Sequence, residues 1–361
     1  MREKATIRLL APQNDSVTPP LQEWTWPEDQ VGPHAESSRW DDLHVMSGDR
    51  SVPRALPFTW EVSLPHGGSA SYELAISRHD NFDDPLVLRN LSEPRAEVRH
   101  LNIATRYFWK VAATRSGRRV AVSPVWSFTT NSLPPRWIRV PGITNVRDIG
   151  GWPLPGDRIV RQGVIYRSSE MNSHLDITEE GREILIHELG IRTDLDLRGD
   201  TEETGPALDT RMVRWINIPV MPYEGICEET AKKSCRKVFE TFADASNYPI
   251  LFHCWGGADR GGTVAFLLGA LLGMSLSDLI RDYELTSLSI WGARSRESDE
   301  FKRMLNVLAR FGNGKGHINE QVENYLRAAG LTEKRIASIR TQCIVPGPGS
   351  FAERGGSRRV L

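Results

Sequence analysis

The fold of the second half of the chain is decided by one stretch, NYPILFHCWGGADRGGT, from Asn247 to Thr263. Its apolar first part predicts a buried strand, and the run TVAFLLGALLGM that begins at its last residue predicts a helix. Gly256 and Gly257 let the backbone bend between the two without side chains in the way. A cysteine at the end of a buried strand, followed by glycines and by an arginine at the start of a helix, predicts a loop that binds an anion. We call Cys254–Arg260 the anion loop.

Short apolar segments alternate with helical stretches around this loop. We expect strands at 159–168, 193–198, 215–220 and 249–254, and helices at 176–190, 260–273, 275–286, 297–311, 319–329 and 332–342. Asp176 is the expected N-cap of the first helix, and Gly190 is expected to end it. Strands that alternate with helices predict an α/β domain with a largely parallel sheet, whose ligands bind beyond the carboxyl ends of the strands. Cys254 lies at such an end.

The first 130 residues follow a different pattern, because apolar and polar residues alternate with a period of two. Segments such as ASYELAISRHD and SPVWSFTT predict half-buried antiparallel strands, and Gly67-Gly68 and Ser116-Gly117 supply turns. The region contains the segments IRLLAPQND, FTWEV, YELAIS, LNIATRYFWKVAA and SPVWSFTT. In these segments it resembles a fibronectin type III-like module. Tyr107 occupies the place where such sandwiches have their corner tyrosine.

The composition excludes several classes of protein. The 361 residues are enough for two domains, and a net charge of −1 with 25% charged residues gives no reason to expect a nucleic-acid partner. The longest apolar run, Val264–Met274, is too short to span a membrane. Four cysteines without a CxxC pair predict neither a disulfide scaffold nor a zinc site. No export signal is visible, so the cytoplasm is the default compartment, while the sandwich leaves a secreted or periplasmic location open.

The residues of the anion loop have a shared chemistry. A thiol attacks as its thiolate, and a position at a helix N-terminus favours that form. The backbone N–H groups of the loop can surround a tetrahedral anion, and the arginine offers a planar fork for two phosphate oxygens. Together they predict transfer of a phosphoryl group to Cys254 and its hydrolysis by water. The expected phosphate-binding residues are Trp255, Gly256, Gly257, Ala258, Asp259 and Arg260.

The cysteine-x5-arginine pattern of this loop is part of a wider resemblance. The chain contains four motifs: ITNVRDIGG (143–151), VIYRSSEMNSH (164–174), LGIRTDLDLRGDTEE (189–203) and HCWGGADRGGT (253–263). They occur in the order found in the bacterial tyrosine phosphatase family. The resemblance covers about residues 135–343. It implies a phosphocysteine intermediate, and the family includes lipid-directed and dual-specificity members.

The resemblance also implies a role for each matching residue. Cys254 is the nucleophile, Arg260 is the oxyanion clamp, and Asp259 is the general acid. Glu224, in MPYEGI, is the alternative acid, because dual-specificity enzymes carry an acid loop near that place. The supporting residues are Arg147, Asp148, Arg167, Arg198 and His253. We expect them mainly to stabilise the domain, with Arg167 or Arg198 as candidates to line the pocket.

Two positions depart from the family pattern. Gly261 stands where family members usually have a serine or threonine, whose hydroxyl stabilises the departing thiolate. Its absence predicts slow turnover with accumulated phosphocysteine unless Thr263 substitutes. Ala258 stands where lipid-directed members have a lysine, and the loss of that cation argues against highly charged substrates.

The expected fold class is multi-domain, with an N-terminal all-β sandwich and an α/β cysteine-phosphatase domain whose central, mostly parallel sheet is flanked by helices. The sandwich covers 1–130 with a long insertion near 16–53, followed by a Pro-stiffened linker at 131–137, the catalytic domain at 138–345 and a disordered tail at 346–361. In the insertion, Trp26–Asp29 superficially resembles the Trp-Pro-Asp loop of tyrosine phosphatases. We interpret it as a loop whose tryptophans pack on the sandwich or on the neighbouring domain.

These observations predict a metal-independent phosphomonoester hydrolase without a cofactor, a protein-tyrosine or dual-specificity phosphatase. Its substrate is expected to be a phosphotyrosine-containing protein or a small phosphoester, and the sandwich is expected to bind a partner or present the substrate. Hydrolysis of a phosphoinositide or inositol phosphate is one alternative. A phosphate-binding pseudophosphatase, suggested by Gly261, is another. A rhodanese-like sulfur carrier also uses a cysteine in an anion-binding loop, but the ordered motifs argue against it.

Overall fold

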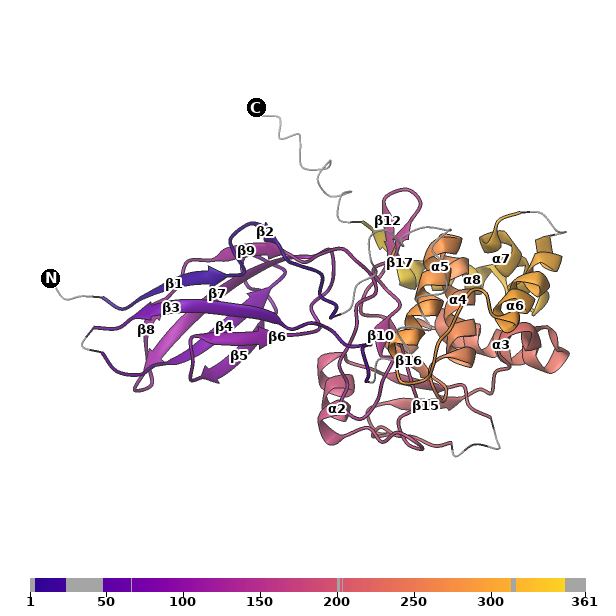
Figure 1. Ribbon diagram of the computed structural model, residues 1–361, viewed down its shortest axis with the longest axis horizontal. Coiled ribbons are helices and arrows are strands. Elements are labelled where there is room, and N and C mark those ends of the chain that lie inside the picture. The colour runs from indigo at the N-terminus through magenta and orange to yellow at the C-terminus, as the bar shows by residue number, and fades with distance from the viewer. Residues whose placement is uncertain are drawn as a thin grey trace, which may run out of the picture. The chain divides into compact units, whose positions relative to one another are not determined.

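The computed structural model describes residues 4–23, 48–65, 67–199, 202, 204–312 and 316–347. The chain forms two compact units: Met1–Gln22 with Pro53–Leu133, and Glu23–Val52 with Pro134–Leu361 (Figure 1). Residues 48–52, which the sequence placed in an insertion of the sandwich, group with the second unit. Trp26–Asp29 and the tail after Gly347 lie outside the described residues.

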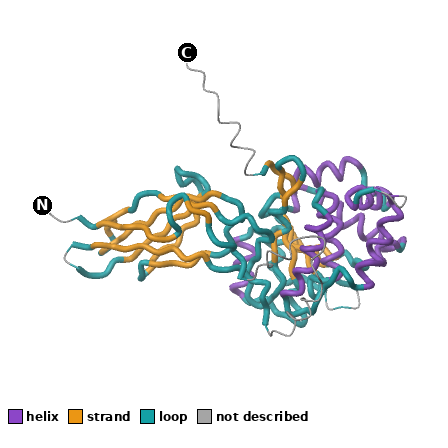
Figure 2. The backbone as a smooth tube through the Cα atoms, turned by 45° about the horizontal axis from the view of Figure 1, so that its top comes forward, coloured by secondary structure: helices purple, strands orange, loops and turns teal. Residues whose placement is uncertain are grey.

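The first unit is an all-β sandwich, as predicted (Figure 2). One sheet has the order β1-β3-β6, and the other has the order β2-β9-β7-β4-β5 with β8 paired to β7. The strands are β1 (Thr6–Ala11), β2 (Ser16–Val17), β3 (Leu56–Ser63), β4 (Ser71–Ser77), β5 (Leu86–Leu91), β6 (Arg95–Val98), β7 (Arg106–Arg115), β8 (Arg118–Val122) and β9 (Trp126–Thr129). Phe58 of one sheet packs edge-on against Trp109 of the other, with ring centres 5.1 Å apart, because alternate residues of both sheets face one core.

Tyr107 confirms the predicted tyrosine corner. Its side chain is buried, and its hydroxyl oxygen accepts a hydrogen bond from the backbone N–H of Asn102 at 3.0 Å. The bond ties the loop before β7 back to the strand, which is the arrangement that such sandwiches share.

The second unit is built on a five-stranded sheet with the order β10-β13-β16-β14-β15. Its strands are β10 (Arg147–Asp148), β13 (Ile165–Ser168), β14 (Thr193–Asp196), β15 (Arg214–Asn217) and β16 (Ile250–His253). Strands β13, β16, β14 and β15 pair in parallel with one another, and only the pair of β10 with β13 is antiparallel among the described strands of this sheet. The mostly parallel sheet is therefore confirmed. A small antiparallel sheet joins β11 (Pro153–Leu154), β12 (Arg158–Val160) and β17 (Ile344–Pro346).

Helices occupy the predicted places, with two differences. They are α2 (Glu179–Glu183) continued by η2 (Ile184–Glu188), η3 (Tyr223–Cys227), α3 (Glu229–Ala243), η4 (Ala245–Asn247), α4 (Asp259–Leu272), α5 (Leu276–Glu284) with η5 (Leu285–Leu288), α6 (Asp299–Ala309) with η6 (Arg310–Gly312), α7 (Ile318–Ala328) and α8 (Glu333–Cys343). The prediction that Asp176 caps α2 was wrong. Asp176 bridges to Asn172 in extended conformation, and Thr178 makes the capping bond to Gly181 N–H.

Helix α3 was not predicted from the sequence. Its apolar positions recur with helical spacing and are buried, but its N-cap, Glu228, makes no side-chain capping bond. The serine or threonine that marks the start of α2, α5, α6 and α8 is therefore missing here.

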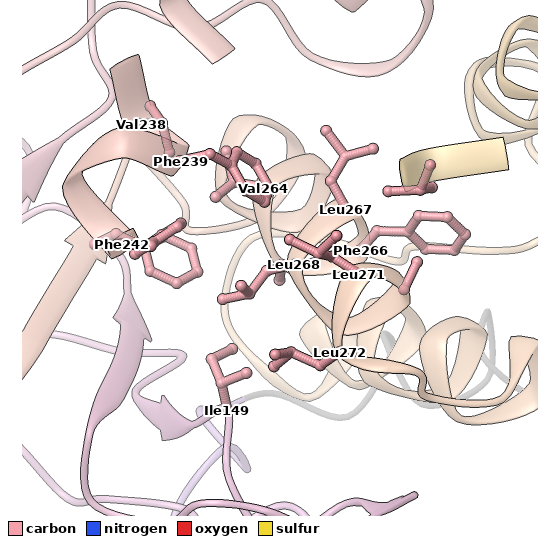
Figure 3. Close-up of a cluster of buried hydrophobic side chains, with 14 of the residues drawn as sticks. Ile149, Val238, Phe239, Phe242, Val264, Phe266, Leu267, Leu268, Leu271 and Leu272 are labelled. Atoms are coloured by element: carbon pink, nitrogen blue, oxygen red, sulfur yellow. The ribbon is translucent and has the colours of Figure 1, made fainter. Parts of the chain in front are cut away.

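Helix α4 is the centre of the core and starts at the anion loop. From Gly261 to Leu272 all its residues are buried, and Figure 3 shows its apolar side chains between Ile149 and the residues Val238, Phe239 and Phe242 of α3. A helix enclosed on all sides is rigid, so the core fixes the position of its N-terminus. No described helix is both long and apolar enough to cross a membrane.

Candidate active site

The anion loop joins the central strand β16 to α4. Cys254 follows the last residue of β16 and is buried, with 2% of its surface exposed. Because β13 and β14 flank β16 in parallel, the cysteine lies at the carboxyl edge of the sheet, where α/β folds bind their ligands. The strand and helix at the two ends of the loop are both core elements, so the loop has fixed ends.

Three carbonyl groups of the loop are turned towards its supports. Trp255 O accepts from Glu170 N–H at 2.7 Å, Gly256 O accepts from Asn145 Nδ2 at 3.1 Å, and Gly257 O accepts from Arg167 Nη2 at 2.5 Å. In a trans peptide the N–H of the next residue points opposite to the carbonyl. The N–H groups of Gly256, Gly257 and Ala258 therefore point away from the supports, and no described residue accepts from them. Three such N–H groups in succession are donors that an oxyanion could use.

Both glycines of the loop lie too close to neighbouring atoms to carry a side chain. Gly257 has a φ of +63°, and a Cβ there would lie 2.3 Å from the carbonyl oxygen of Ser168. A Cβ on Gly256 would lie 2.9 Å from the ring of Trp291. A side chain at either position would push the loop off its supports.

Arg260 at the start of α4 forms a two-pronged ion pair with Glu202. Its Nη2 donates to Oε1 of Glu202 at 2.8 Å, and its Nη1 donates to Oε2. Burial acts to lower the pKa of Arg260, but the hydrogen bonds with Glu202 and the nearby Cys254 side chain outweigh burial and raise it. The pair fixes the plane of the guanidinium next to the cysteine. Sequence reasoning missed Glu202, because nothing distinguishes it from the acidic residues around it.

Asp259 is held beside the loop by two partners that sequence reasoning also missed. Arg294 Nε and Nη2 each donate to one of its carboxylate oxygens at 2.9 Å, and the hydroxyl of Tyr223 donates to Oδ1. The pKa of Tyr223 is raised by burial and by the neighbouring Tyr283 and Asp259, so the hydroxyl keeps its proton. The Asp259 side chain is still 41% exposed, which leaves it open to a ligand.

Glu224 faces another part of the unit. Its Oε1 accepts from Arg303 Nε of α6 at 2.5 Å, and the pKa of Glu224 is lowered by its own backbone N–H and by Arg303. The preceding residue, Tyr223, reaches Asp259, but among the described residues no contact joins the Glu224 side chain to the anion loop.

Arg147 and Arg167 support the loop through a shared carboxylate. Arg147 Nε donates to Asp282 Oδ1 at 2.8 Å, and Arg167 Nη1 donates to Oδ2 at 2.7 Å. Both arginines are fully buried. Burial and the charge of Arg147 lower the pKa of Arg167 to about 10. Since Arg167 also binds the carbonyl of Gly257, it contacts the loop from behind.

Asp148 and His253 are buried away from the concave side of the loop. Asp148 accepts from two backbone N–H groups at 2.7 Å each and pairs with Arg136 at 3.1 Å, while burial raises its pKa. His253 Nε2 lies 3.0 Å from Asp194 Oδ1. Burial acts to lower the pKa of His253, but the charge of Asp194 outweighs it and raises the pKa.

An aromatic surface lies next to the loop. The Trp255 ring, 41% exposed, packs on His174 with centres 4.4 Å apart and meets Trp291 at 6.3 Å. Glu170 accepts from His174 N–H at 2.8 Å and from Arg198 Nη1 at 3.2 Å. Arg198 is 1% exposed, so it positions these groups from below. We call Trp255, His174 and Trp291 the aromatic rim.

The two departures from the family pattern have clear structural settings. A Cβ on Gly261 would lie 3.7 Å from Cys254 Sγ, which is ordinary contact, so a serine fits there. The hydroxyl oxygen of Thr263 accepts from Tyr223 N–H at 3.0 Å, which leaves its own proton to donate. Ala258 is buried and adds no charge to the loop.

Comparison with known proteins gives consistent matches. The model of the tyrosine phosphatase family matches residues 138–345. A candidate tyrosine-protein phosphatase of Cupriavidus necator is 28% identical over 170 residues, covering 39% of this chain and 59% of that protein. The tyrosine-protein phosphatase of Nostoc commune is 27% identical over 169 residues, covering 41% of this chain and 54% of that protein. The chain thus spans less than two thirds of the length of these curated relatives.

Among solved structures, the core catalytic domain of the PP-IP phosphatase Siw14 from Saccharomyces cerevisiae matches 45% of this chain and 96% of its own. The identity is 20% and the TM-score is 0.30.

Proposed function

The chain belongs to the tyrosine phosphatase family, and from this premise we propose that it hydrolyses phosphomonoesters through a phosphocysteine at Cys254. The observation that carries the proposal is the geometry of the anion loop. One short segment contains a buried thiol, three N–H groups that no described residue accepts from, and a guanidinium that Glu202 holds. This combination supplies a nucleophile and the positive field that a phosphoryl group needs.

The reaction has two steps at this site. Non-bridging phosphate oxygens bind the loop N–H groups and Arg260, and Cys254 Sγ attacks phosphorus. The bond from phosphorus to the ester oxygen breaks with its electron pair, and Asp259 gives that oxygen a proton. Water then attacks the phosphocysteine, Asp259 takes a proton from it, and the S–P bond breaks to release phosphate and the thiolate.

Asp259 suits the acid role because its position needs no loop closure. The contacts with Arg294 and Tyr223 hold the carboxyl beside the first turn of α4, next to Arg260. A proton donor must lie within hydrogen-bonding reach of the leaving oxygen. Glu224 binds Arg303 on α6, and among the described residues its side chain has no contact with the anion loop.

We propose phosphotyrosine-like aryl phosphates as the substrates. The exposed Trp255 ring offers a flat apolar surface beside the thiol, which suits an aromatic leaving group. Ala258 adds no cation for a further phosphate. A panel of a phosphotyrosine peptide, a phosphoserine peptide, a phosphoinositide and an inositol phosphate tests this. We expect kcat/KM for the phosphotyrosine peptide to be the highest by about tenfold or more. A preference for an inositol phosphate would overturn the substrate assignment.

Asp259→Asn should separate the general acid from a structural residue. We expect kcat/KM, which reports the transfer to Cys254, to fall about 100-fold or more for phenyl phosphate, whose leaving group needs a proton, and only a few-fold for p-nitrophenyl phosphate. Glu224→Gln is the matched control and should leave both rates within about twofold, as expected for an exposed surface pair. Equal losses of kcat/KM on both esters in Asp259→Asn would show that Asp259 only supports the loop.

Gly261→Ser should speed the second step. The added hydroxyl would contact Cys254 Sγ and stabilise the departing thiolate, since a Cβ there already lies 3.7 Å from the sulfur. One hydrogen bond to a charged group is worth roughly tenfold in rate. Rapid-quench kinetics should show a smaller burst and a faster steady state. Gly261→Ala, which adds the Cβ without the hydroxyl, should leave the burst unchanged, and equal effects of the two variants would contradict this account.

A further inference from the structure

The segment Asp49–Ser51 belongs to the second unit although it precedes the sandwich strand β3 in the sequence. Asp49 Oδ1 accepts from Ser51 N–H at 2.9 Å and from Ser51 Oγ at 2.5 Å, so the segment is folded around one carboxylate. Its other oxygen, Oδ2, accepts from Thr144 Oγ1 at 2.5 Å. Ser51 is 2% exposed, so these bonds are shielded from water.

The same segment holds the backbone of Asn145. Ser51 Oγ accepts from Asn145 N–H at 3.0 Å. Asn145 is fully buried and has a φ of +58°, in the left-handed region that asparagine adopts more readily than most residues. Its Oδ1 is held by Arg147 Nη1, and its Nδ2 donates to Gly256 O of the anion loop at 3.1 Å. A hydrogen-bonded chain thus runs from Asp49 through Ser51 and Asn145 to the loop.

A second contact ties the segment to the other support of the loop. Arg50 N–H donates to Leu288 O at 2.8 Å, at the end of η5. Trp291, whose ring packs over the Cα of Gly256, follows shortly after Leu288. Arg294 comes next along this stretch and binds Asp259. Asp49–Ser51 therefore contacts both stretches of chain that hold Gly256.

We propose that Asp49–Ser51 is a positioning segment for the anion loop, with Ser51 as its central residue. This inference rests on the proposed function, because it assigns the segment a role in phosphate binding and turnover. The peptide between Gly256 and Gly257 is oriented by the Asn145 amide, and the Asn145 backbone is oriented by Ser51. Loss of the Ser51 hydroxyl leaves the buried Asn145 N–H without its acceptor, so Asn145 and then the loop peptide relax from the geometry that directs N–H groups at the phosphate.

The consequence is that part of the catalytic unit is encoded inside the sequence of the N-terminal module. The matched family region, 138–345, does not include Asp49–Ser51. The segment is therefore a feature of this chain that the family pattern alone does not predict.

Ser51→Ala and Asp49→Asn in the full chain test the proposal. We measure kcat/KM on p-nitrophenyl phosphate, the dissociation constant of orthovanadate by calorimetry and the melting temperature. Both variants should lower kcat/KM by about tenfold or more and weaken orthovanadate binding by a similar factor. The free-energy cost of one buried unsatisfied polar group corresponds to about this factor. Ser338→Ala is the matched control, since its hydroxyl donates to Ala243 O at 2.6 Å in a helical region outside the loop supports. It should lower the melting temperature comparably but leave orthovanadate binding unchanged.

The outcomes are distinct. If Ser51→Ala and Asp49→Asn bind orthovanadate as the wild type does, or lose no more than Ser338→Ala, the segment is merely structural and the proposal is wrong. If the wild type binds orthovanadate but hydrolyses no phosphoester, the proposed function fails. The orthovanadate affinities of the variants relative to the wild type still show whether Asp49–Ser51 positions the loop. If the wild type neither binds nor hydrolyses, both fail.

Discussion

Replacing Cys254 with serine is expected to lower kcat on p-nitrophenyl phosphate by at least about 10⁴-fold, as the loss of a nucleophile does in other enzymes. A hydroxyl is a far weaker nucleophile at neutral pH than a thiolate. The oxygen is smaller than the sulfur and leaves the N–H row of the loop and Arg260 unchanged. We therefore expect phosphate binding by calorimetry to stay within about threefold, because these donors supply most of the contacts.

Cys227→Ser is the matched control for this substitution. Cys227 is half-buried at the end of η3, and burial raises the pKa of its thiol, so it should contribute nothing to turnover. Its variant should keep the wild-type rate within about twofold, as substitutions away from a site usually do. Residual activity of Cys254→Ser above a hundredth of the wild type would mean that another group attacks phosphorus.

Arg260→Lys is expected to have the second largest effect, a loss of about 100- to 1,000-fold in kcat/KM. A lysine keeps the charge but cannot hold two phosphate oxygens and the two oxygens of Glu202 in one plane. The loss should fall mainly on kcat, because the equatorial oxygens need the fork most in the transition state.

Arg303→Lys is its control on the protein surface. Arg303 pairs with Glu224, and both side chains are about half exposed, so the exchange should change kcat/KM less than twofold. If Arg260→Lys lost less than about tenfold, a point charge would suffice and the bidentate clamp would be refuted.

The sequence predicted those parts of the fold that depend on local pattern. The period of two and the position of Tyr107 indicated the sandwich, and the alternation of strands and helices indicated the parallel sheet. Helix α3 was missed because its start lacks a capping side chain, and α2 starts later than expected because Asp176 is drawn into a bridge with Asn172. Both errors come from helix ends, where tertiary contacts compete with local signals.

For the candidate site too, the sequence predicted the local pattern but not the contacts between distant segments. Cys254, Asp259 and Arg260 lie in one continuous stretch, so their pattern is visible without a structure. Glu202 binds Arg260 and Arg294 binds Asp259, and both come from distant segments. The same is true of Asp282 and Ser51, which bind the loop supports Arg167 and Asn145. Each is one of many similar residues, and only the folded chain shows which of them meets the loop.

The central claim, that Cys254 attacks phosphorus, is tested most directly by trapping the intermediate. The wild-type chain is mixed with p-nitrophenyl phosphate, quenched in acid within milliseconds and digested for mass spectrometry. The account predicts one added phosphoryl group on the peptide that contains Cys254, formed at least as fast as steady-state turnover. A phosphoryl group on any other residue, or turnover without a covalent adduct in both wild type and Gly261→Ala, would contradict it.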